Sequence, residues 1–285
     1  MNHLILLLYY YIILLLHYNN YSIIMLLSYY NLRIHSKRLG LMKHLPVLDT
    51  RFFFSTEPLP CPYLPNRIER RVVTELLGRN ATNFHNRLSE VGFRRSHNIA
   101  YSPACPGCHA CQAVRIVVGD FKLSHSQNRI IKKNKDILVE RVQVIATPEQ
   151  YELFLAYQES RHNNGEMSKM DFQAYRSLIE DTPVESELIE FRLDDHTLVA
   201  VCLLDKVKNG LSAVYNFYQP SLSRRSLGTF MILWLVKSAK CLGMKFIYLG
   251  FWIDGCSKMS YKQKFKPLEI WTTDGWRCFD ARLNS

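Results

Sequence analysis

The first 41 residues contain no acidic residue, and the whole chain is poor in acidic side chains relative to basic ones. Lys and Arg number 36 and Asp and Glu number 25, which gives a formal charge of +11 over 285 residues. An excess of this size favours an anionic partner, and nucleic acid is the commonest one. Most of the charge belongs to the body of the chain, because residues 1–41 hold only three basic side chains.

The chain also lacks a hydrophobic run long enough to cross a membrane. The run Leu4–Leu16 falls short of the roughly 20 residues that a spanning helix needs. No basic region precedes it and no small-residue cleavage site follows it, so it makes a poor signal peptide. A weak anchor, a disordered extension or upstream sequence read from too early a start remain. We favour the last, with Met42 as the natural start, and we expect a cytoplasmic protein without a membrane partner.

The cysteines do not form a pattern typical of disulfides. Four of the eight are scattered singly, which suits reduced thiols. Cys105, Cys108 and Cys111 instead follow a Cys-x₂-Cys-x₂-Cys spacing that places three thiols around one small loop. Such a set suits zinc or an iron–sulfur cluster, with Cys61 as the fourth ligand and His109 as a substitute. The alternative is a turn that merely holds three reduced thiols.

Hydrophobic periodicity and turn residues predict a mixture of helices and strands. In the N-terminal part they predict helices over 66–77 and 83–91, a strand over 113–118 and a basic helix over 124–135 that carries Arg129, Lys132, Lys133 and Lys135. In the C-terminal part they predict a helix over 148–162, a short helical segment within 165–183, strands over 188–193, 197–204 and 211–218, a helix over 226–242 and a strand over 245–253. Strand, helix and strand over 211–253 predict a right-handed parallel crossover, and therefore an α/β domain with a mixed sheet.

Two short segments are candidates for binding an anion. Arg224-Arg225-Ser-Leu-Gly228 follows a predicted strand and opens a helix, where backbone N–H groups favour phosphate. Its Arg-x-x-Gly core is similar to the pyrophosphate loop of acetyltransferases that use coenzyme A, although Phe230 stands where that motif ends in a small residue. Lys258-Met-Ser-Tyr261-Lys262 follows the last predicted strand, where an anion would bind near the strand's end. The alternative for both segments is a solvated basic surface.

Seven segments together identify a resemblance that covers the chain from about residue 50 to its C-terminus. They are Cys61-Pro-Tyr-Leu, Gly92-Phe-Arg-Arg-Ser, Tyr101-x-Pro-x-Cys-x-x-Cys-x-x-Cys111, Arg161-His162, Leu211-Ser-Ala-Val-Tyr-Asn-Phe-Tyr218, Arg225-Ser-Leu-Gly228, and Tyr248-Leu-Gly-Phe-Trp-Ile253 with Lys258-Met-x-Tyr-Lys262. In this order they resemble the bacterial branch of the arginyl/leucyl-tRNA–protein transferases, the aspartate/glutamate leucyltransferases. Gln219 departs from the family, which usually carries an acidic residue before Pro220.

The resemblance implies a fold of mixed α+β or α/β class in two domains. A smaller N-terminal domain for tRNA and substrate, with the cysteine site, would span 42–147. An acetyltransferase-like aminoacyl-transfer domain with a mixed sheet would span 148–285, and residues 1–41 would lie outside the fold.

The resemblance also implies the reaction. Leucine would pass from leucyl-tRNA to an N-terminal Asp or Glu of another protein and so mark it for degradation through the N-end rule pathway. An aminoacyl ester is already activated, so no ATP site is needed, and the sequence contains no P-loop pattern. Coenzyme A is not expected either, since Phe230 departs from its pyrophosphate motif. The nucleophile is an α-amine with a pKa near 8, which is partly neutral without a strong base.

Roles for individual residues follow as hypotheses. Catalysis is assigned to the segment Tyr215-Asn216-Phe217, which would line the cleft and offer backbone N–H groups to the oxyanion, and to His162 as a proton acceptor. The 3′-terminal tRNA phosphate is assigned to Arg224, Arg225 and Gly228. The acceptor's acidic side chain and the tRNA backbone are assigned to Lys258, Tyr261, Lys262, Arg94 and Arg95, with Lys258 or Lys262 preferred for the acceptor.

Two alternatives belong to other functional classes. One is an N-acetyltransferase that uses coenzyme A, which would turn over a thioester without tRNA. The other is a non-catalytic, metal-stabilised RNA-binding protein, which would bind uncharged tRNA without any transfer to a peptide.

Overall fold

The structure, a computed structural model, describes residues 50–162 and 165–279. The described residues from Arg51 onward form one compact unit. Our predictions about residues 1–41 and about a start at Met42 lie outside the described residues. No helix among the described residues is long and apolar enough to cross a membrane.

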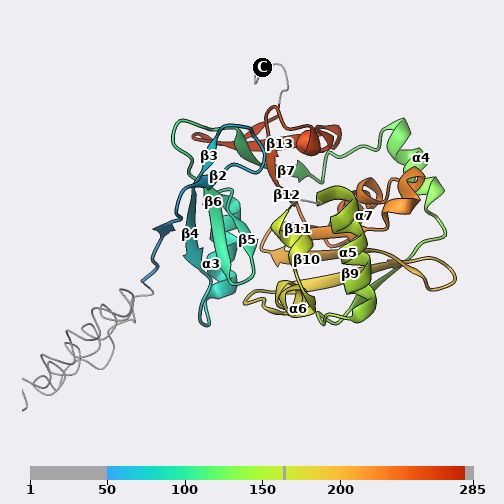
Figure 1. The fold of residues 1–285 in the computed structure, drawn as a ribbon. Helices are drawn as coiled ribbons and strands as arrows, with labels where there is room; N and C mark the ends of the chain where they lie inside the picture. Colours follow the sequence, from blue (N-terminus) through green and yellow to red (C-terminus); the bar gives the residue numbers. More distant parts are fainter. Residues whose placement is uncertain (1–49, 163–164, 280–285) are drawn as a thin grey trace, which may run out of the picture. The chain divides into compact units, whose positions relative to one another are not determined.

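The described chain contains both helices and strands, with strands predominating in its N-terminal part (Figure 1). The N-terminal part comprises β1 (Phe54–Ser55), β2 (Leu59–Pro60), β3 (Ile68–Glu69), β4 (Arg71–Glu75), α3 (Ala81–Glu90), β5 (Arg94–Ser96), β6 (Ile99–Pro103), β7 (Cys111–Val117), α4 (His125–Lys133) and β8 (Leu138–Val142). The C-terminal part comprises α5 (Pro148–His162), the 3-10 helix η1 (Glu166–Lys169), α6 (Phe172–Glu180), β9 (Ser186–Arg192), β10 (Leu198–Val207), β11 (Gly210–Tyr218), the 3-10 helix η2 (Pro220–Arg225), α7 (Leu227–Cys241), β12 (Phe246–Ile253), the 3-10 helix η3 (Ser257–Lys264), β13 (Leu268–Thr272) and β14 (Gly275–Cys278).

An eight-stranded mixed sheet forms the centre of this unit, in the order β14-β13-β7-β12-β11-β10-β9-β8. Strands β11 and β12 are parallel and are connected through α7, whereas the other neighbours pair antiparallel. The predicted α/β class with a mixed sheet and a parallel crossover is confirmed. The sheet takes strands from both sides of the expected domain boundary at 147/148, because β7 and β8 pair with strands of the C-terminal part.

The two faces of the sheet are covered by different helices, and β10 shows this in its side chains. Ala200, Cys202 and Leu204 belong to one hydrophobic cluster, which includes α7 residues. Val201 and Leu203 belong to another, which includes α5 and α6 residues. Successive strand residues point to opposite faces, so a strand buried on both sides is apolar at nearly every position.

A second, four-stranded sheet of order β1-β4-β6-β5 packs with α3 around a smaller cluster that includes Leu76, Phe84 and Leu88. α3 confirms the predicted helix over 83–91, and Gly92 follows it with φ of 83°, a left-handed conformation that glycine adopts without steric cost. The predicted helix over 66–77 is wrong, since this segment forms β3 and β4.

The reason lies in local geometry and in strand pairing. Asn66 has φ of 57° and therefore makes a turn instead of an N-cap. Glu69, expected in a capping box, forms an ion pair with Arg71 at 2.9 Å. Strand β4 then pairs with β1 on one edge and with β6 on the other. Two long-range pairings outweigh the local helical pattern of apolar residues.

Candidate active site

The parallel strands β11 and β12 separate toward their C-terminal ends. They pair only over Gly210–Ser212 and Phe246–Tyr248. Beyond this point β12 has an irregularity between Tyr248 and Gly250 and continues to pair with β7 on its other edge. Ligands of α/β proteins commonly bind where the carboxyl ends of neighbouring strands diverge. We call this region the strand divergence.

Arg94, from β5 of the smaller sheet, reaches into the strand divergence. Its guanidinium donates to Ser212 Oγ at 2.8 Å and to the carbonyl of Ala213, and only 8% of the residue is exposed. It also packs against Gly250, where an added Cβ would lie 3.0 Å from Arg94 Nε. Burial lowers the pKa of Arg94, which means that the protein around it does not fully replace its hydration.

Lys262, from η3, is the second buried cation at this place. It is 5% exposed, and its Nζ donates to the carbonyl of Phe251 at 2.5 Å. Burial and the nearby charge of Arg94 lower its pKa to about 7. Neither Arg94 nor Lys262 forms an ion pair with a carboxylate of the described residues. Buried cations are costly unless they are paired, so this site favours an anionic group supplied by a ligand.

Tyrosines and amides surround the β11 side of the strand divergence. Gln158 of α5 donates to the hydroxyl of Tyr215 at 2.5 Å, and burial raises the pKa of Tyr215 to about 12. Tyr157 packs edge-on against Tyr218, with ring centroids 5.0 Å apart. The side-chain oxygens of Asn216 and Gln158 are buried and accept no hydrogen bond from the described residues. These two oxygens are therefore buried acceptors that lack a donor among the described residues.

Tyr215 and Asn216 were predicted from the sequence, whereas Tyr157 and Gln158 were missed. A signal for Gln158 exists, because it follows Phe154 by four residues and therefore lies on the buried stripe of α5. A polar residue on such a stripe needs a hydrogen-bond partner. His162 ends α5, and its side chain lies outside the described part of the chain.

The predicted phosphate-binding residues fall into different environments. Arg225 forms a two-pronged ion pair with Asp136, with distances of 2.9 and 2.8 Å. Arg224 is exposed and forms no ion pair with another described residue. Gly228 lies against the ring of Tyr218, where an added Cβ would approach to 2.9 Å. Arg224 is therefore the arginine available for a phosphate, and Arg225 holds η2 next to the segment that follows α4.

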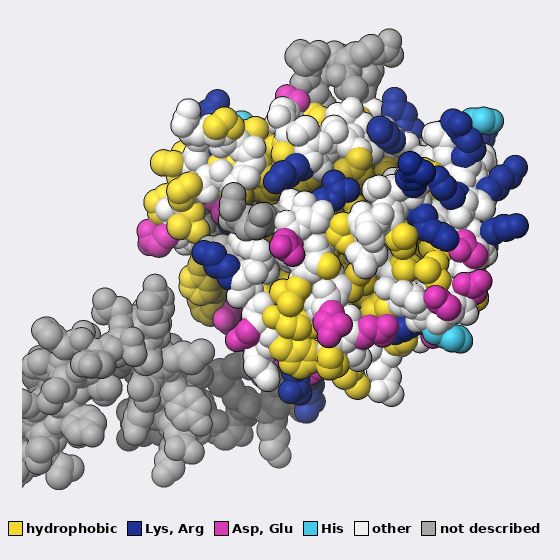
Figure 2. All heavy atoms as spheres, turned by 45° about the vertical axis from the view of Figure 1, so that its right-hand side comes forward, with side chains coloured by type: hydrophobic (Ala, Val, Ile, Leu, Met, Phe, Trp, Pro, Cys, Tyr) yellow, Lys and Arg dark blue, Asp and Glu magenta, His cyan; other side chains and the backbone are white. Residues whose placement is uncertain are grey.

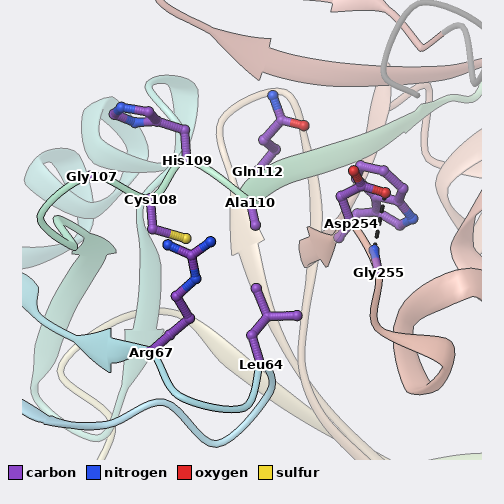
Figure 3. A pocket seen from close by; sticks show the side chains of 10 residues that line it. Leu64, Arg67, Gly107, Cys108, His109, Ala110, Gln112, Asp254 and Gly255 are labelled. Atoms are coloured by element: carbon purple, nitrogen blue, oxygen red, sulfur yellow. Dashed lines mark hydrogen bonds between the residues drawn. The ribbon is translucent and has the colours of Figure 1, made fainter.

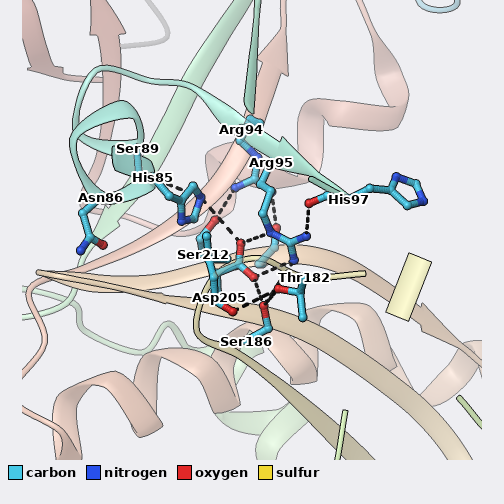
Figure 4. Close-up of polar contacts among 12 residues, drawn as sticks. His85, Asn86, Ser89, Arg94, Arg95, His97, Thr182, Ser186, Asp205 and Ser212 are labelled. Atoms are coloured by element: carbon cyan, nitrogen blue, oxygen red, sulfur yellow. Dashed lines mark hydrogen bonds and ion pairs between the residues drawn. The ribbon is translucent and has the colours of Figure 1, made fainter. Parts of the chain in front are cut away.

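Arg95 and Lys258 lie in environments that differ from those of Arg94 and Lys262. Arg95 donates to Asp205 through Nε at 2.6 Å and through its terminal nitrogen at 2.7 Å (Figure 4). Ser186 donates to the same carboxylate at 2.6 Å, and His85 lies 3.7 Å from it. The carboxylate of Asp205 in this buried network neutralises the charge of Arg95. Lys258 is exposed on η3, and 41% of its neighbour Tyr261 is exposed.

The four predicted metal ligands lie in one region. Burial and the thiols of Cys105, Cys61 and Cys108 raise the pKa of Cys111 to about 12. The backbone N–H of Arg70 donates to Cys105 Sγ at 3.4 Å, as N–H groups do around thiolate ligands. The donor chemistry thus fits zinc or a cluster. However, no three His, Cys, Asp or Glu side chains in the described ranges are arranged to hold a metal ion, so the metal site stays a prediction.

An open pocket of about 520 Å³ lies beside the cysteine loop (Figure 3). Its lining includes the polar side chains of Arg67, His109, Gln112 and Asp254 together with Cys108. Of these residues, only Cys108 and His109 are predicted from the sequence as site residues. The pocket does not include Arg94, Lys262 or Tyr215, so it is separate from the strand divergence.

Comparisons with known proteins place the chain among tRNA-dependent transferases. The family described as arginine-tRNA-protein transferase, N terminus, matches residues 59–129, and its C-terminal counterpart matches residues 149–272. An aspartate/glutamate leucyltransferase from Paramagnetospirillum magneticum is 51% identical over 84% of this chain and 98% of its own length. One from Granulibacter bethesdensis is 47% identical over 81% and 87%. The crystal structure of FemX aligns over 75% of this chain and 73% of its own, with 8% identity and a TM-score of 0.47.

Proposed function

This chain belongs to the arginine-tRNA-protein transferase family, among the aspartate/glutamate leucyltransferases, and we propose that it transfers leucine from leucyl-tRNA to the N-terminal Asp or Glu of cytoplasmic proteins. The α-amine of the acceptor attacks the carbonyl carbon of the leucyl ester. A C–N bond forms, the C–O bond to the terminal ribose breaks, and the tRNA leaves with a free hydroxyl. The proton lost by the amine balances the one gained by that hydroxyl.

The observation that carries this proposal is the pair of buried cations without a carboxylate partner, Arg94 and Lys262. An N-terminal Asp or Glu places a carboxylate a few bonds from the attacking amine. Bound between the two cations, it would supply the missing negative charge and leave the amine at the strand divergence. Of the two lysines preferred from the sequence, we assign the acceptor's carboxylate to Lys262, with Arg94 as its companion, since Lys258 is exposed.

Tyr215 and Asn216 are proposed to orient the reacting groups next to these cations. The free side-chain oxygen of Asn216 would accept a hydrogen bond from the acceptor's amine, because it is buried and lacks another donor. The hydroxyl of Tyr215, held by Gln158, would lie beside the leucyl ester, where hydrogen bonds to the developing oxyanion lower the barrier. Arg224 and Gly228, on the segment that continues from β11, would hold the 3′-terminal phosphate.

Phe230 distinguishes this proposal from a coenzyme A-dependent acetyltransferase. It occupies the place of the small residue that ends the pyrophosphate motif, and it is buried in the core with its ring 6.0 Å from that of Phe191. The loop therefore carries a large, buried side chain at the position where that motif has glycine or alanine.

One assay tests the proposed function against both alternatives. The protein is incubated with tRNA carrying labelled leucine or arginine and with peptides that begin with Asp, Glu, Lys or Ala. We expect leucine on the Asp and Glu peptides alone. Turnover of acetyl-coenzyme A without tRNA would instead support an acetyltransferase. Binding of uncharged tRNA without transfer to any peptide would support a non-catalytic RNA-binding protein.

The predicted metal site has its own test. If Cys61, Cys105, Cys108 and Cys111 share one zinc ion or cluster, serine at any one of them should release it and destabilise the protein, since binding energy at such a site is folding energy. Metal analysis of anaerobically purified protein measures the loss. Cys202→Ser, in the buried strand β10, is the control that should keep the metal. A metal-free wild-type protein with full transfer activity would contradict the prediction.

A further inference from the structure

The described structure carries a group of exposed cations, of which the proposed chemistry uses only Arg224. We call it the α4 patch, and its members come from three segments: Lys122, Arg129, Lys132, Lys133 and Lys135 around α4, Arg224 of η2, and Lys264 and Lys266 at the end of η3. No ion pair of the described residues involves any of them. Figure 2 shows Lys and Arg side chains gathered on the side of the molecule where Figure 1 places α4.

Hydrogen bonds hold the three segments together. Gln127, inside α4, donates through Nε2 to the carbonyl of Lys264 at 3.0 Å. Asn134, which ends α4, donates through Nδ2 to the carbonyl of Arg225 at 2.9 Å. The ion pair between Arg225 and Asp136 adds a second link on the same side. The cations of the α4 patch are therefore displayed on a fixed surface.

The charge of this surface is unusual for a folded helix. Residues 122–135 contain no Asp or Glu, and Arg129 lies three and four positions before Lys132 and Lys133. Like charges at these spacings repel each other on one helix face and lower its stability. Ser124 and Gln127 form a capping box that supports the helix in spite of this repulsion. Such an arrangement is favourable when a polyanion lies across the helix.

The apolar face of α4 decides between two polyanionic surfaces, a nucleic acid and a membrane. A helix that binds in a membrane interface inserts an apolar face. Ile130 and Ile131, the isoleucines of α4, instead pack against the core cluster that contains α7. The exposed face of α4 thus carries cations, while its isoleucines are not free to insert into a membrane. Its nine residues span about 14 Å, a length that faces several phosphates of a double helix.

We infer that the α4 patch binds the double-helical acceptor arm of tRNA through its phosphates, without recognising bases. The inference rests on the proposed function. Arg224 connects the patch to the strand divergence, because η2 directly follows β11. A duplex lying along α4 would direct its single-stranded 3′ end past Arg224 toward Tyr215 and Asn216. The transferred leucine would then meet the acceptor held by Arg94 and Lys262.

The test measures tRNA binding over a series of salt concentrations. The variant Arg129→Gln/Lys132→Gln/Lys133→Gln removes three cations and keeps good helix formers. Each lost phosphate contact lowers the slope of log K against log salt by about 0.9, so the slope should fall by roughly 2.7. Affinity for uncharged tRNA should fall by about several hundredfold at 0.1 M salt and converge with that of the wild type near 1 M. The double variant Lys132→Gln/Lys133→Gln should show about two thirds of this slope change.

A matched control carries the same change of charge elsewhere. Lys208, Lys237 and Lys240 are exposed, lie on the turn before β11 and on the C-terminal half of α7, and form no ion pair among the described residues. Their triple replacement by Gln should leave the slope unchanged. Transfer by the α4 variant at saturating leucyl-tRNA should match the wild type, because the reacting groups are untouched.

Three outcomes would overturn the inference. An unchanged salt slope in the folded α4 variant would do so while wild-type transfer still upheld the proposed function. Equal competition by a single-stranded RNA with the same number of phosphates as a short duplex would remove the preference for a double helix. Wild-type binding to phosphatidylserine vesicles that the α4 variant loses, with tRNA binding intact, would assign the patch to a membrane. A wild type that transfers no leucine but shows the expected slopes would overturn the proposed function alone.

Discussion

Lys262→Met and Arg94→Met should each reduce kcat/KM for peptides that begin with Asp by about 10- to 150-fold, and leave Asn peptides nearly unaffected. A charge-assisted hydrogen bond is worth about 1.5–3 kcal/mol, which corresponds to that range. Labelled transfer to paired Asp and Asn peptides measures the selectivity. Lys258→Met is the matched control, since Lys258 is an exposed cation on the same 3-10 helix.

Stability separates this role from a structural one. Lys262 is buried without a carboxylate partner, so methionine at this position removes an uncompensated charge. The thermal midpoint of Lys262→Met should therefore stay the same or rise while selectivity is lost. If the variant unfolds more easily and keeps its preference for Asp over Asn, Lys262 is a structural residue.

The pH profile gives a second readout for the same residue. Burial and Arg94 lower the pKa of Lys262 to about 7, so the free enzyme loses this positive charge as the pH rises through 7. The acceptor amine becomes nucleophilic as the pH rises toward its own pKa of about 8. For Asp peptides, kcat/KM should rise up to pH 7, stay level to about 8 and fall above it. Lys262→Met should lose the fall. A wild-type profile that stays level above pH 8 would contradict a cationic role and favour neutral Lys262 as a base.

Asp205→Ala should destabilise the protein by about 3–5 kcal/mol, because it leaves Arg95 buried and unpaired. The side chains of Arg95 and Asp205 are 1% and 0% exposed, and two hydrogen bonds of 2.6 and 2.7 Å join them. In a unit of this size, the loss corresponds to a fall in the thermal midpoint of roughly 6–20 °C. Urea unfolding followed by circular dichroism gives the free energy of unfolding directly.

Two further variants test the physical reason for this loss. Asp136→Ala removes the partner of Arg225, where the side chains are 34% and 25% exposed, and should cost no more than about 1 kcal/mol because solvent screens the remaining charge. Replacing Arg95 by Met in the Asp205→Ala protein should recover part of the stability, since no buried charge is then left alone. A double variant as unstable as the single one would show that the network stabilises through packing instead.

Local sequence was sufficient for the elements whose patterns are short-range. The sequence predicted the helices α4, α5 and α7 and the strands β9 to β12, because their signals depend only on nearby residues. These signals are the apolar periodicity of each segment and the residues that begin or end helices, namely Ser124, Pro148 and Gly243. The parallel crossover followed from the order of these elements. The family could also be identified from the sequence, because its motifs are continuous stretches.

The environment of neighbouring residues of the same type depends on the tertiary structure. Arg94 and Arg95 are adjacent in β5, so their side chains point to opposite faces, one toward the strand divergence and the other toward Asp205. Lys258 and Lys262 lie on one short helix, yet only Lys262 is buried against β12. Strands β3 and β4 replaced a predicted helix because their partners, β1 and β6, lie elsewhere in the chain. Residue types and local patterns established which cations are present and where most elements of the C-terminal part lie. Only the packing of distant segments determined which charges were buried, paired or left for a ligand, because desolvation depends on neighbours that local patterns do not specify.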